Sequence, residues 1–251
     1  MGIKRVIKAV LSKVIPKKVK EVIVNSEAYS PYINMAFSQE GEDLILSRLF
    51  ESKKSGFYVD IGAHHPFRFS NTYKFYREGW SGINLDPLPG AMKLFDKYRS
   101  RDINIEVAIS NNPGTELTYY VFDDPALNSF NEKEAKKIDK NTKYNIISTL
   151  KIKTERLADI LSKTLPKNTV IDFFSIDVEG LDLSVLQSNN WELFRPTYIV
   201  MESFSARLVK DLNPEIAAFL NDIHYELIAK TVNSWFFLDL KNSAFIKSTQ
   251  Q

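Results

Sequence analysis

The sequence GFYVDIGAHHP, residues 56–66, starts as a nearly unbroken apolar stretch and ends in a turn that carries two histidines. A strand that is apolar along its whole length is buried on both faces, which is typical of a parallel sheet covered by helices. Gly62 follows the stretch directly and lets the backbone approach a ligand where a side chain would block it. The stretch therefore predicts a buried strand whose carboxyl end, at Asp60, adjoins a binding site.

Strand-like and helix-like segments alternate along the rest of the chain. The strand-like segments are residues 56–62, 81–87, 103–110, 116–122, 150–154, 170–180 and 196–203 and a final hairpin over 225–240. This alternation predicts one doubly wound α/β domain over residues 37–251. Within it, residues 123–148 are polar and non-periodic, and we expect an inserted loop or lid there.

Basic residues are concentrated at the N-terminus. The chain has 33 Lys and Arg against 31 Asp and Glu, a net charge of +2, but residues 1–20 contain seven basic residues and no acid. The other residues therefore carry 26 basic and 31 acidic side chains, a net charge of about −5. Because the basic excess is local, the sequence argues against a nucleic-acid surface over the whole protein.

Residues 1–36 form the second predicted unit, a basic amphipathic helix followed by a connector. Aliphatic residues from Ile3 to Ile15 recur at helical spacing with Lys and Arg on the other face, and Pro16 should end the helix. Such a helix can lie in a membrane interface through residues 3–15. The same stripe would equally suit packing on the enzyme body or on a second subunit, and the sequence leaves these alternatives open.

The composition excludes several classes of protein. The chain has no cysteine, which excludes disulfides, cysteine nucleophiles and thiolate metal sites. No apolar run reaches the ~18 residues that a membrane span needs, and the N-terminus lacks the pattern of a signal peptide. We therefore expect a cytoplasmic protein, with the N-terminal helix as its candidate for contact with the inner face of the membrane.

Acidic residues follow the apolar strands where the strands end. They are Asp60, Asp86, Asp177, Glu179 and Glu202. In an open parallel sheet, ligands bind outside the carboxyl ends of the strands, near the point where the strand order reverses. Asp86 lies 24 residues after Gly62, which suits an acid that accepts hydrogen bonds from two ribose hydroxyls.

The turn after the first strand disfavours a dinucleotide. Pyrophosphate binding needs three glycines in a G-x-G-x-x-G turn, whereas Gly62 is followed by Ala63, His64, His65 and Pro66. Proline also removes an amide donor. A dehydrogenase is therefore the weaker alternative, and the acids favour a nucleoside that has a cationic centre and no phosphates.

Six motifs between Phe37 and Ser203 have the order and spacing of a known family. They are FSQEGEDLIL (37–46), YVDIGAHHP (58–66), SNTYKFYREGWSGINLDPLPG (70–90), VAIS (107–110), LKIKTERLADIL (150–161) and FSIDVEGLDLSVL (174–186). Over about two thirds of its length the chain resembles the FkbM-type methyltransferases, class I enzymes that use S-adenosylmethionine. The resemblance implies a doubly wound, mostly parallel, seven-stranded Rossmann-like sheet with helices on both faces.

The resemblance also implies that Gln39, Glu42, Asp60, Gly62, Ala63, Asp86 and Asp177 contact the cofactor. From their positions after the first strand and at the start of the next helix, we expect the same of His64, Ser70 and Asn71. Two positions depart from the family pattern: His65 or Pro66 stands where the family has a further glycine, and Asp86 stands where many members have Glu. The first departure affects the methionine carboxylate contact, which Ser70, Asn71 or Thr72 at the start of the next helix could supply.

The expected reaction is O-methylation of a sugar hydroxyl in a glycan, glycolipid or related metabolite. A hydroxyl loses its proton during or after attack, so a general base is needed within hydrogen-bond reach. The candidates are His65, Asp177 and Glu179, and no residue pattern specifies a metal. The alternative is a catalytically silent methyltransferase-like protein that keeps the pocket and is recruited to a membrane surface.

Overall fold

The structure, a computed structural model, describes residues 33–51, 53–202 and 212–241 together with residues 16 and 208. The predicted N-terminal helix, residues 3–15, lies outside the described residues. None of the helices in the described part of the chain is long and apolar enough to cross a membrane.

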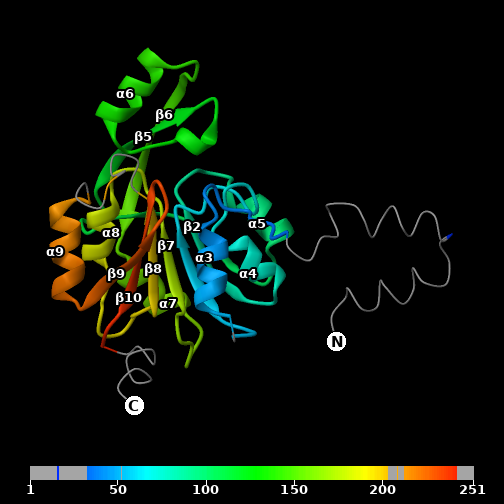
Figure 1. Cartoon of the computed structure of the whole chain (residues 1–251). Coiled ribbons are helices and arrows are strands. Elements are labelled where there is room, and N and C mark those ends of the chain that lie inside the picture. Colours follow the sequence, from blue (N-terminus) through cyan, green and yellow to red (C-terminus); the bar gives the residue numbers. More distant parts are fainter. Residues whose placement is uncertain (1–15, 17–32, 52, 203–207, 209–211, 242–251) are drawn as a thin grey trace. The chain divides into compact units, whose positions relative to one another are not determined.

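Seven strands form one sheet in the order β3-β2-β1-β7-β8-β10-β9 (Figure 1). Their bounds are β1 Phe57–Ile61, β2 Ser81–Asp86, β3 Ile103–Glu106, β7 Phe173–Ile176, β8 Tyr198–Glu202, β9 Tyr225–Lys230 and β10 Ser234–Asp239. The first five in sheet order, β3 to β8, pair in parallel, and β10 pairs antiparallel with both of its neighbours. The predicted mostly parallel seven-stranded sheet is therefore confirmed. Its strand order reverses between β1 and β7.

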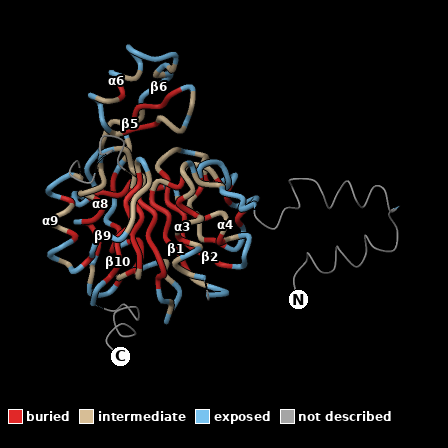
Figure 2. The backbone as a smooth tube through the Cα atoms, in the orientation of Figure 1, coloured by how far each residue is buried: buried red, intermediate tan, exposed pale blue. Residues whose placement is uncertain are grey.

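Helices cover both faces of the sheet, as predicted. They are α3 Glu42–Leu49, α4 Tyr73–Arg77, α5 Met92–Tyr98, α7 Leu157–Thr164, α8 Asp182–Ser188 and α9 Pro214–Asp222. In β1, Val59 packs in the core that holds residues of α7, α8 and α9, while Tyr58 packs in the core that holds residues of α3 and α4. Burial therefore runs through the central strands without alternation (Figure 2), which explains their unbroken apolar sequences.

A second sheet of three strands, β4 (Ala108–Ile109), β6 (Ile146–Glu155) and β5 (Glu116–Phe122), extends beyond the main sheet (Figure 1). The prediction of a loop over residues 123–148 is wrong in its secondary structure. This segment contains the 3₁₀ helix η2 (Pro125–Leu127), helix α6 (Glu132–Asn141) and the start of β6. Helix α6 escapes the apolar pattern because it buries little: Ala135 and Ile138 pack on Phe122 and the rest is polar. We call residues 116–155 the extension.

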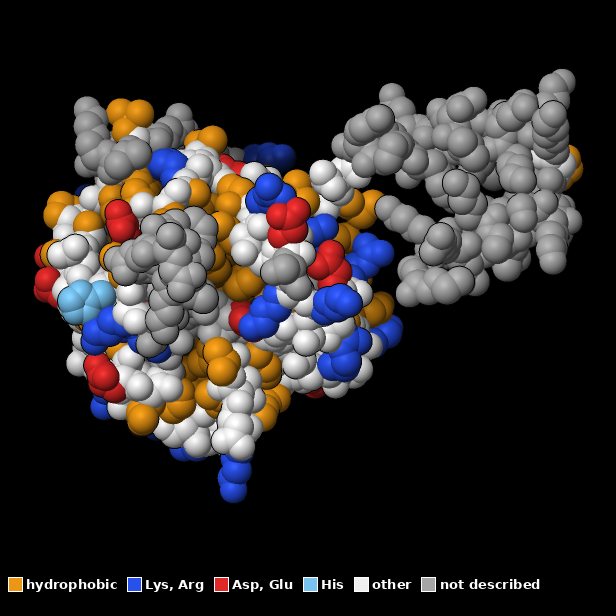
Figure 3. All heavy atoms as spheres, turned by 60° about the horizontal axis from the view of Figure 1, so that its bottom comes forward, with side chains coloured by type: hydrophobic (Ala, Val, Ile, Leu, Met, Phe, Trp, Pro, Cys, Tyr) orange, Lys and Arg blue, Asp and Glu red, His pale blue; other side chains and the backbone are white. Residues whose placement is uncertain are grey.

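One face of the domain carries charges of both signs. Figure 3 shows Lys and Arg side chains interspersed with Asp and Glu side chains and apolar atoms among the described residues there. A single-sign surface of the kind that tracks a nucleic acid backbone does not cover this face.

The turn after β1 packs directly against the end of β7. Gly62 has φ 83°, and a Cβ at this position would lie 1.7 Å from the carbonyl oxygen of Asp177. The neighbouring backbone thus requires glycine at this position, whether or not a ligand also does. Gly114, with φ 80° and open space around the position of a Cβ, offers a matched comparison.

We expect Gly62→Ala to lower the free energy of unfolding by at least about 3 kcal/mol, since overpacking adds to left-handed strain. Gly114→Ala should cost only about 1–2 kcal/mol, because strain acts there alone. Urea unfolding of both variants measures the difference. Equal losses would contradict the close packing of Gly62 on Asp177.

Candidate functional site

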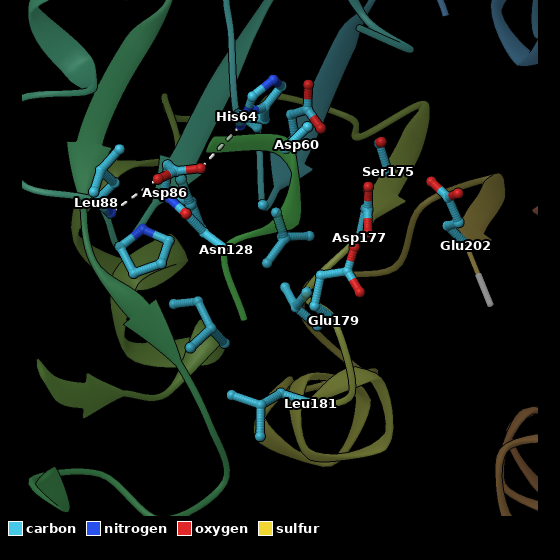
Figure 4. Close-up of a pocket in the computed structure, with 18 of the residues that line it drawn as sticks. Asp60, His64, Asp86, Leu88, Asn128, Ser175, Asp177, Glu179, Leu181 and Glu202 are labelled. Carbon is cyan, nitrogen blue, oxygen red and sulfur yellow. Dashed lines mark hydrogen bonds between the residues drawn. The ribbon is translucent and has the colours of Figure 1, made fainter. Parts of the chain in front are cut away.

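A cavity lies at the carboxyl ends of β1, β2, β7 and β8, next to the reversal of strand order (Figure 4). All of the residues predicted to contact the cofactor line it: Gln39, Glu42, Asp60, Gly62, Ala63, His64, Ser70, Asn71, Asp86 and Asp177. Glu179 and Glu202 line it as well. In the view of Figure 4, Asp86 lies on one side, and Asp177, Glu179 and Glu202 lie on the other. The sheet therefore brings together acids that are far apart in sequence.

His65 does not line this cavity, in contrast to its predicted role as a base. Its Nδ1 accepts hydrogen bonds from the backbone N–H groups of Phe67 (3.3 Å) and Arg68 (3.1 Å). Its ring also packs edge-on against Phe67, with centroids 4.4 Å apart. These contacts shape the turn, because the imidazole takes the place of a backbone acceptor. The structure thus indicates that His65 shapes the turn after β1 and does not line the cavity.

His64 is the histidine of the pair that faces the cavity. Its backbone has φ 53°, in the left-handed region, and its N–H donates to Oδ2 of Asp86 at 2.9 Å. Burial, with a smaller contribution from Arg68, lowers the pKa of its imidazole to about 4. The ring is therefore neutral at pH 7, and its buried Nε2 has no hydrogen-bond partner. A buried, unpartnered ring nitrogen in a cavity is available to a ligand.

Asp86 ends β2 and is held by two backbone donors. Its Oδ1 accepts from the N–H of Leu88 and its Oδ2 from the N–H of His64, both at 2.9 Å. Burial raises the pKa of its carboxyl to about 6 in spite of these bonds. A carboxylate has about four lone-pair sites, so two remain for further donors. Two adjacent hydroxyls of a ribose match this free capacity.

Asp60 is connected to a buried arginine through Thr72. The Thr72 hydroxyl donates to Oδ2 of Asp60 at 2.7 Å and accepts from Nη2 of Arg99 at 3.1 Å. Arg99 is fully buried, and its Nε donates to Oδ2 of Asp102 at 2.8 Å. Its Nη1 also donates to the carbonyl oxygen of Pro66 at 3.0 Å. One guanidinium thus fixes the turn after β1 and supports the first acid of the site.

Asp177, Glu179 and Glu202 form a second group of acids at the ends of β7 and β8. Burial, followed by the nearby Glu202, raises the pKa of Asp177 well above its usual value. Burial raises the pKa of Glu202 to about 7. Burial, followed by the charge of Asp177, raises the pKa of Glu179 to about 9. These carboxyls therefore hold protons at a pH where ordinary carboxyls do not.

The extension supplies one wall of the cavity. Tyr119, Asn128 and Phe130 line it, and the rings of Tyr119 and Phe130 lie 4.6 Å apart. The extension is joined to both acid-bearing turns: Ser129 Oγ donates to the carbonyl oxygen of Glu179 at 3.1 Å, and Asp124 accepts both guanidinium N–H groups of Arg68 at 2.9 Å. The sequence analysis did not predict that the extension contributes to the cavity, although Asp124-Pro125 is a recognisable start of a short helix.

The sequence profile described as the Methyltransferase FkbM domain matches residues 60–227. The chain belongs to the FkbM methyltransferase family. This confirms the predicted family and its cofactor, S-adenosylmethionine. The search of curated proteins found no match.

Several solved structures are similar to the FkbM chain at low identity. The O-methyltransferase from Bacillus cereus in complex with SAH is 14% identical with a TM-score of 0.40, covering 93% of this chain and 96% of that one. A putative O-methyltransferase from Klebsiella pneumoniae is 13% identical with a TM-score of 0.41, covering 94% and 96%. The 1,6-didemethyltoxoflavin-N1-methyltransferase from Burkholderia thailandensis is 12% identical with a TM-score of 0.39, covering 88% and 80%. At these values the similarities carry no argument about the substrate.

The cavity of this FkbM protein suits a cationic nucleoside. Of the described residues that line it, six are carboxylic acids and none is Lys or Arg: Glu42, Asp60, Asp86, Asp177, Glu179 and Glu202. A phosphate group would lack a counter-charge in such a lining, whereas a sulfonium group would find several. Within the described part of the chain, no group of three His, Asp or Glu side chains is arranged to hold a metal ion.

The Thr72 hydroxyl should be important for stability because it bonds to a buried carboxylate and a buried guanidinium. We expect Thr72→Val, which keeps the shape and removes the hydroxyl, to lower the free energy of unfolding by about 2–3 kcal/mol. Thr72→Ser keeps the hydroxyl and should cost about 1 kcal/mol for the lost methyl group. Chemical denaturation compares the two variants, and a Val variant as stable as the Ser variant would refute the link.

Proposed function

We propose that this FkbM protein methylates a hydroxyl group of a sugar, in a glycan, glycolipid or related metabolite. The observation that carries the proposal is the position of Glu179. This partly exposed acid lines the cavity after β7 and has φ 50°, a backbone conformation that costs energy for a residue other than glycine. Such strain is found most often where a side chain must be held for function.

Glu179 is our candidate for the general base. Its raised pKa, about 9, makes its carboxylate a stronger base than an ordinary one once it has lost its proton. S-adenosylmethionine supplies an electrophilic methyl group when it is bound. The Glu179 carboxylate then accepts the proton of the acceptor hydroxyl. Asp177, the other acid predicted as a base, is instead paired with Glu202, whose proximity raises its pKa.

The remaining predicted residues would hold the cofactor. Asp86 would accept the two ribose hydroxyls, and Asp60 and Asn71 would lie toward the methionine end. Ser70 is committed elsewhere, because its Oγ accepts from the backbone N–H of Tyr73 at 3.1 Å at the start of α4. The rings of Tyr119 and Phe130 offer the acceptor an apolar surface of the kind that the face of a sugar ring can pack on.

The acceptor class is tested with a glycan pool from a cell envelope, incubated with the full chain and a cofactor that carries a deuterated methyl group. We expect mass spectrometry to find the label on sugar oxygens. An unlabelled pool would contradict the sugar acceptor. Cofactor binding without transfer to any fraction would instead support the silent binding protein.

The membrane contact of residues 3–15 and the cytoplasmic location stay predictions from the sequence. Flotation of the full chain with anionic lipid vesicles, compared with a chain that starts at residue 33, measures the membrane contact. Flotation of neither protein would contradict it.

Replacing Glu179 should separate catalysis from binding. We expect Glu179→Gln to lower kcat by about 10²–10⁴-fold, since the base is lost, with the affinity for S-adenosylmethionine changed less than about threefold. Asp86→Ala should do the reverse and weaken mainly cofactor binding, because it removes the hydrogen bonds to the ribose. Calorimetry and methyl-transfer kinetics give both quantities, and the opposite pattern would reject these roles.

The pH dependence of kcat/KM should report Glu179. Because the ionised carboxylate is the active form, kcat/KM should rise as the pH is raised toward the pKa of this group in the free protein, about 9, and level off above it. The residual activity of Glu179→Gln should lack this rise. A bell-shaped pH profile of the rate, centred near pH 6, would indicate another base.

A further inference from the structure

The acids of the cavity divide into two groups according to the cations near them. Asp60 is approached by the buried Arg99 through Thr72. No such partner is found for Asp177 and Glu202: among the described residues, neither has an ion pair or hydrogen bond to a Lys or Arg side chain, and the charged groups that raise their pKa values most are acidic. They are Glu40 and Glu42 from the α3 side, Asp60 from β1, and Glu179 and Asp182 after β7.

The fold places Asp177 and Glu202 side by side at the carboxyl ends of β7 and β8. Ile176, which precedes Asp177, pairs in register with Met201, which precedes Glu202, so the two acids follow adjacent strands at the same level. Glu42, which lines the same cavity, is 2% exposed and accepts a hydrogen bond from Ser234 Oγ at 2.7 Å. Asp177 and Glu202 are themselves only partly exposed, so protons or a cation in the cavity are the groups best placed to offset their negative charge.

We propose that Asp177 and Glu202 form a charge-selective subsite that binds the sulfonium form of the cofactor in preference to its neutral thioether product and exchanges a proton for it. The inference rests on the assignment of this cavity to S-adenosylmethionine. The free protein shares a proton between the two carboxyls. A sulfonium cation stabilises both in the ionised form, and the proton leaves to the solvent.

The same subsite would help to release the product. Methyl transfer converts the sulfonium into an uncharged sulfur, so the bound product no longer offsets the two carboxylates. One of them must then take up a proton again or remain as an uncompensated buried charge. Both alternatives weaken product binding relative to cofactor binding, and the first becomes more costly as the pH rises, because a proton must then be taken from a more alkaline solution.

Calorimetric titration of the full chain tests the exchange directly. S-adenosylmethionine and S-adenosylhomocysteine are titrated at pH 7.5 in two buffers with different ionisation enthalpies, which reports the protons released. We expect proton release with S-adenosylmethionine and much less with S-adenosylhomocysteine. The ratio of the two dissociation constants, product over cofactor, should rise between pH 6 and pH 8.5, because only the cation gains from ionised carboxyls.

Glu202→Gln and Asp177→Asn should each lower that ratio by about tenfold, the equivalent of one pKa unit of interaction, and should remove the difference in proton release. Asp159→Asn, at an exposed acid of α7 that does not line the cavity, is the matched control and should leave both quantities unchanged. Two variants at the pair keep the test valid if one of them fails to fold.

The outcomes separate this inference from the assignment beneath it. If both ligands bind with equal proton release and a ratio that neither pH nor the variants change, the charge-selective subsite is wrong and the cofactor cavity stands. If neither ligand binds, the assignment of the cavity fails and the inference fails with it. Failure to methylate a sugar would leave both intact.

Discussion

The turn after β1 rests against the backbone of β7, with Gly62 directly on the carbonyl oxygen of Asp177. This contact brings together the two strand ends between which the strand order reverses, where an open α/β sheet has its ligand crevice. The backbone amides of Gly62 and Ala63 also donate to the carbonyl oxygen of Leu85. Three strand ends are thus held together by one residue without a side chain, and the acids after them share a cavity as a result.

Charge compensation then gives the two sides of the cavity different properties. On the side of β1, a buried guanidinium bonds the loop at Pro66 and reaches Asp60 through Thr72. On the side of β7 and β8, partly exposed carboxyls lie together without a described cation. A ligand with a positive sulfur would complete the second side, and a ribose diol would suit Asp86, which lines the cavity and has two lone-pair sites left. The cofactor of the FkbM family has both groups.

Local patterns in the sequence predicted the parts of the site that depend on β1 and β2. The unbroken apolar run at 57–61 requires burial on both faces, so Gly62 and Asp86 could be placed at strand ends. The choice between His64 and His65 could not be made, because it depends on the course of the turn, in which His64 has a left-handed backbone and lines the cavity while His65 does not. Helix α6 of the extension was missed because it buries only a small apolar face.

A crystal structure of the chain with S-adenosylhomocysteine tests the central claim most directly. The account predicts that both ribose hydroxyls donate to the carboxylate of Asp86, with the sulfur on the side of Asp177 and Glu202. A nucleoside bound outside this cavity, or bound within it with its diol away from Asp86, would contradict the account.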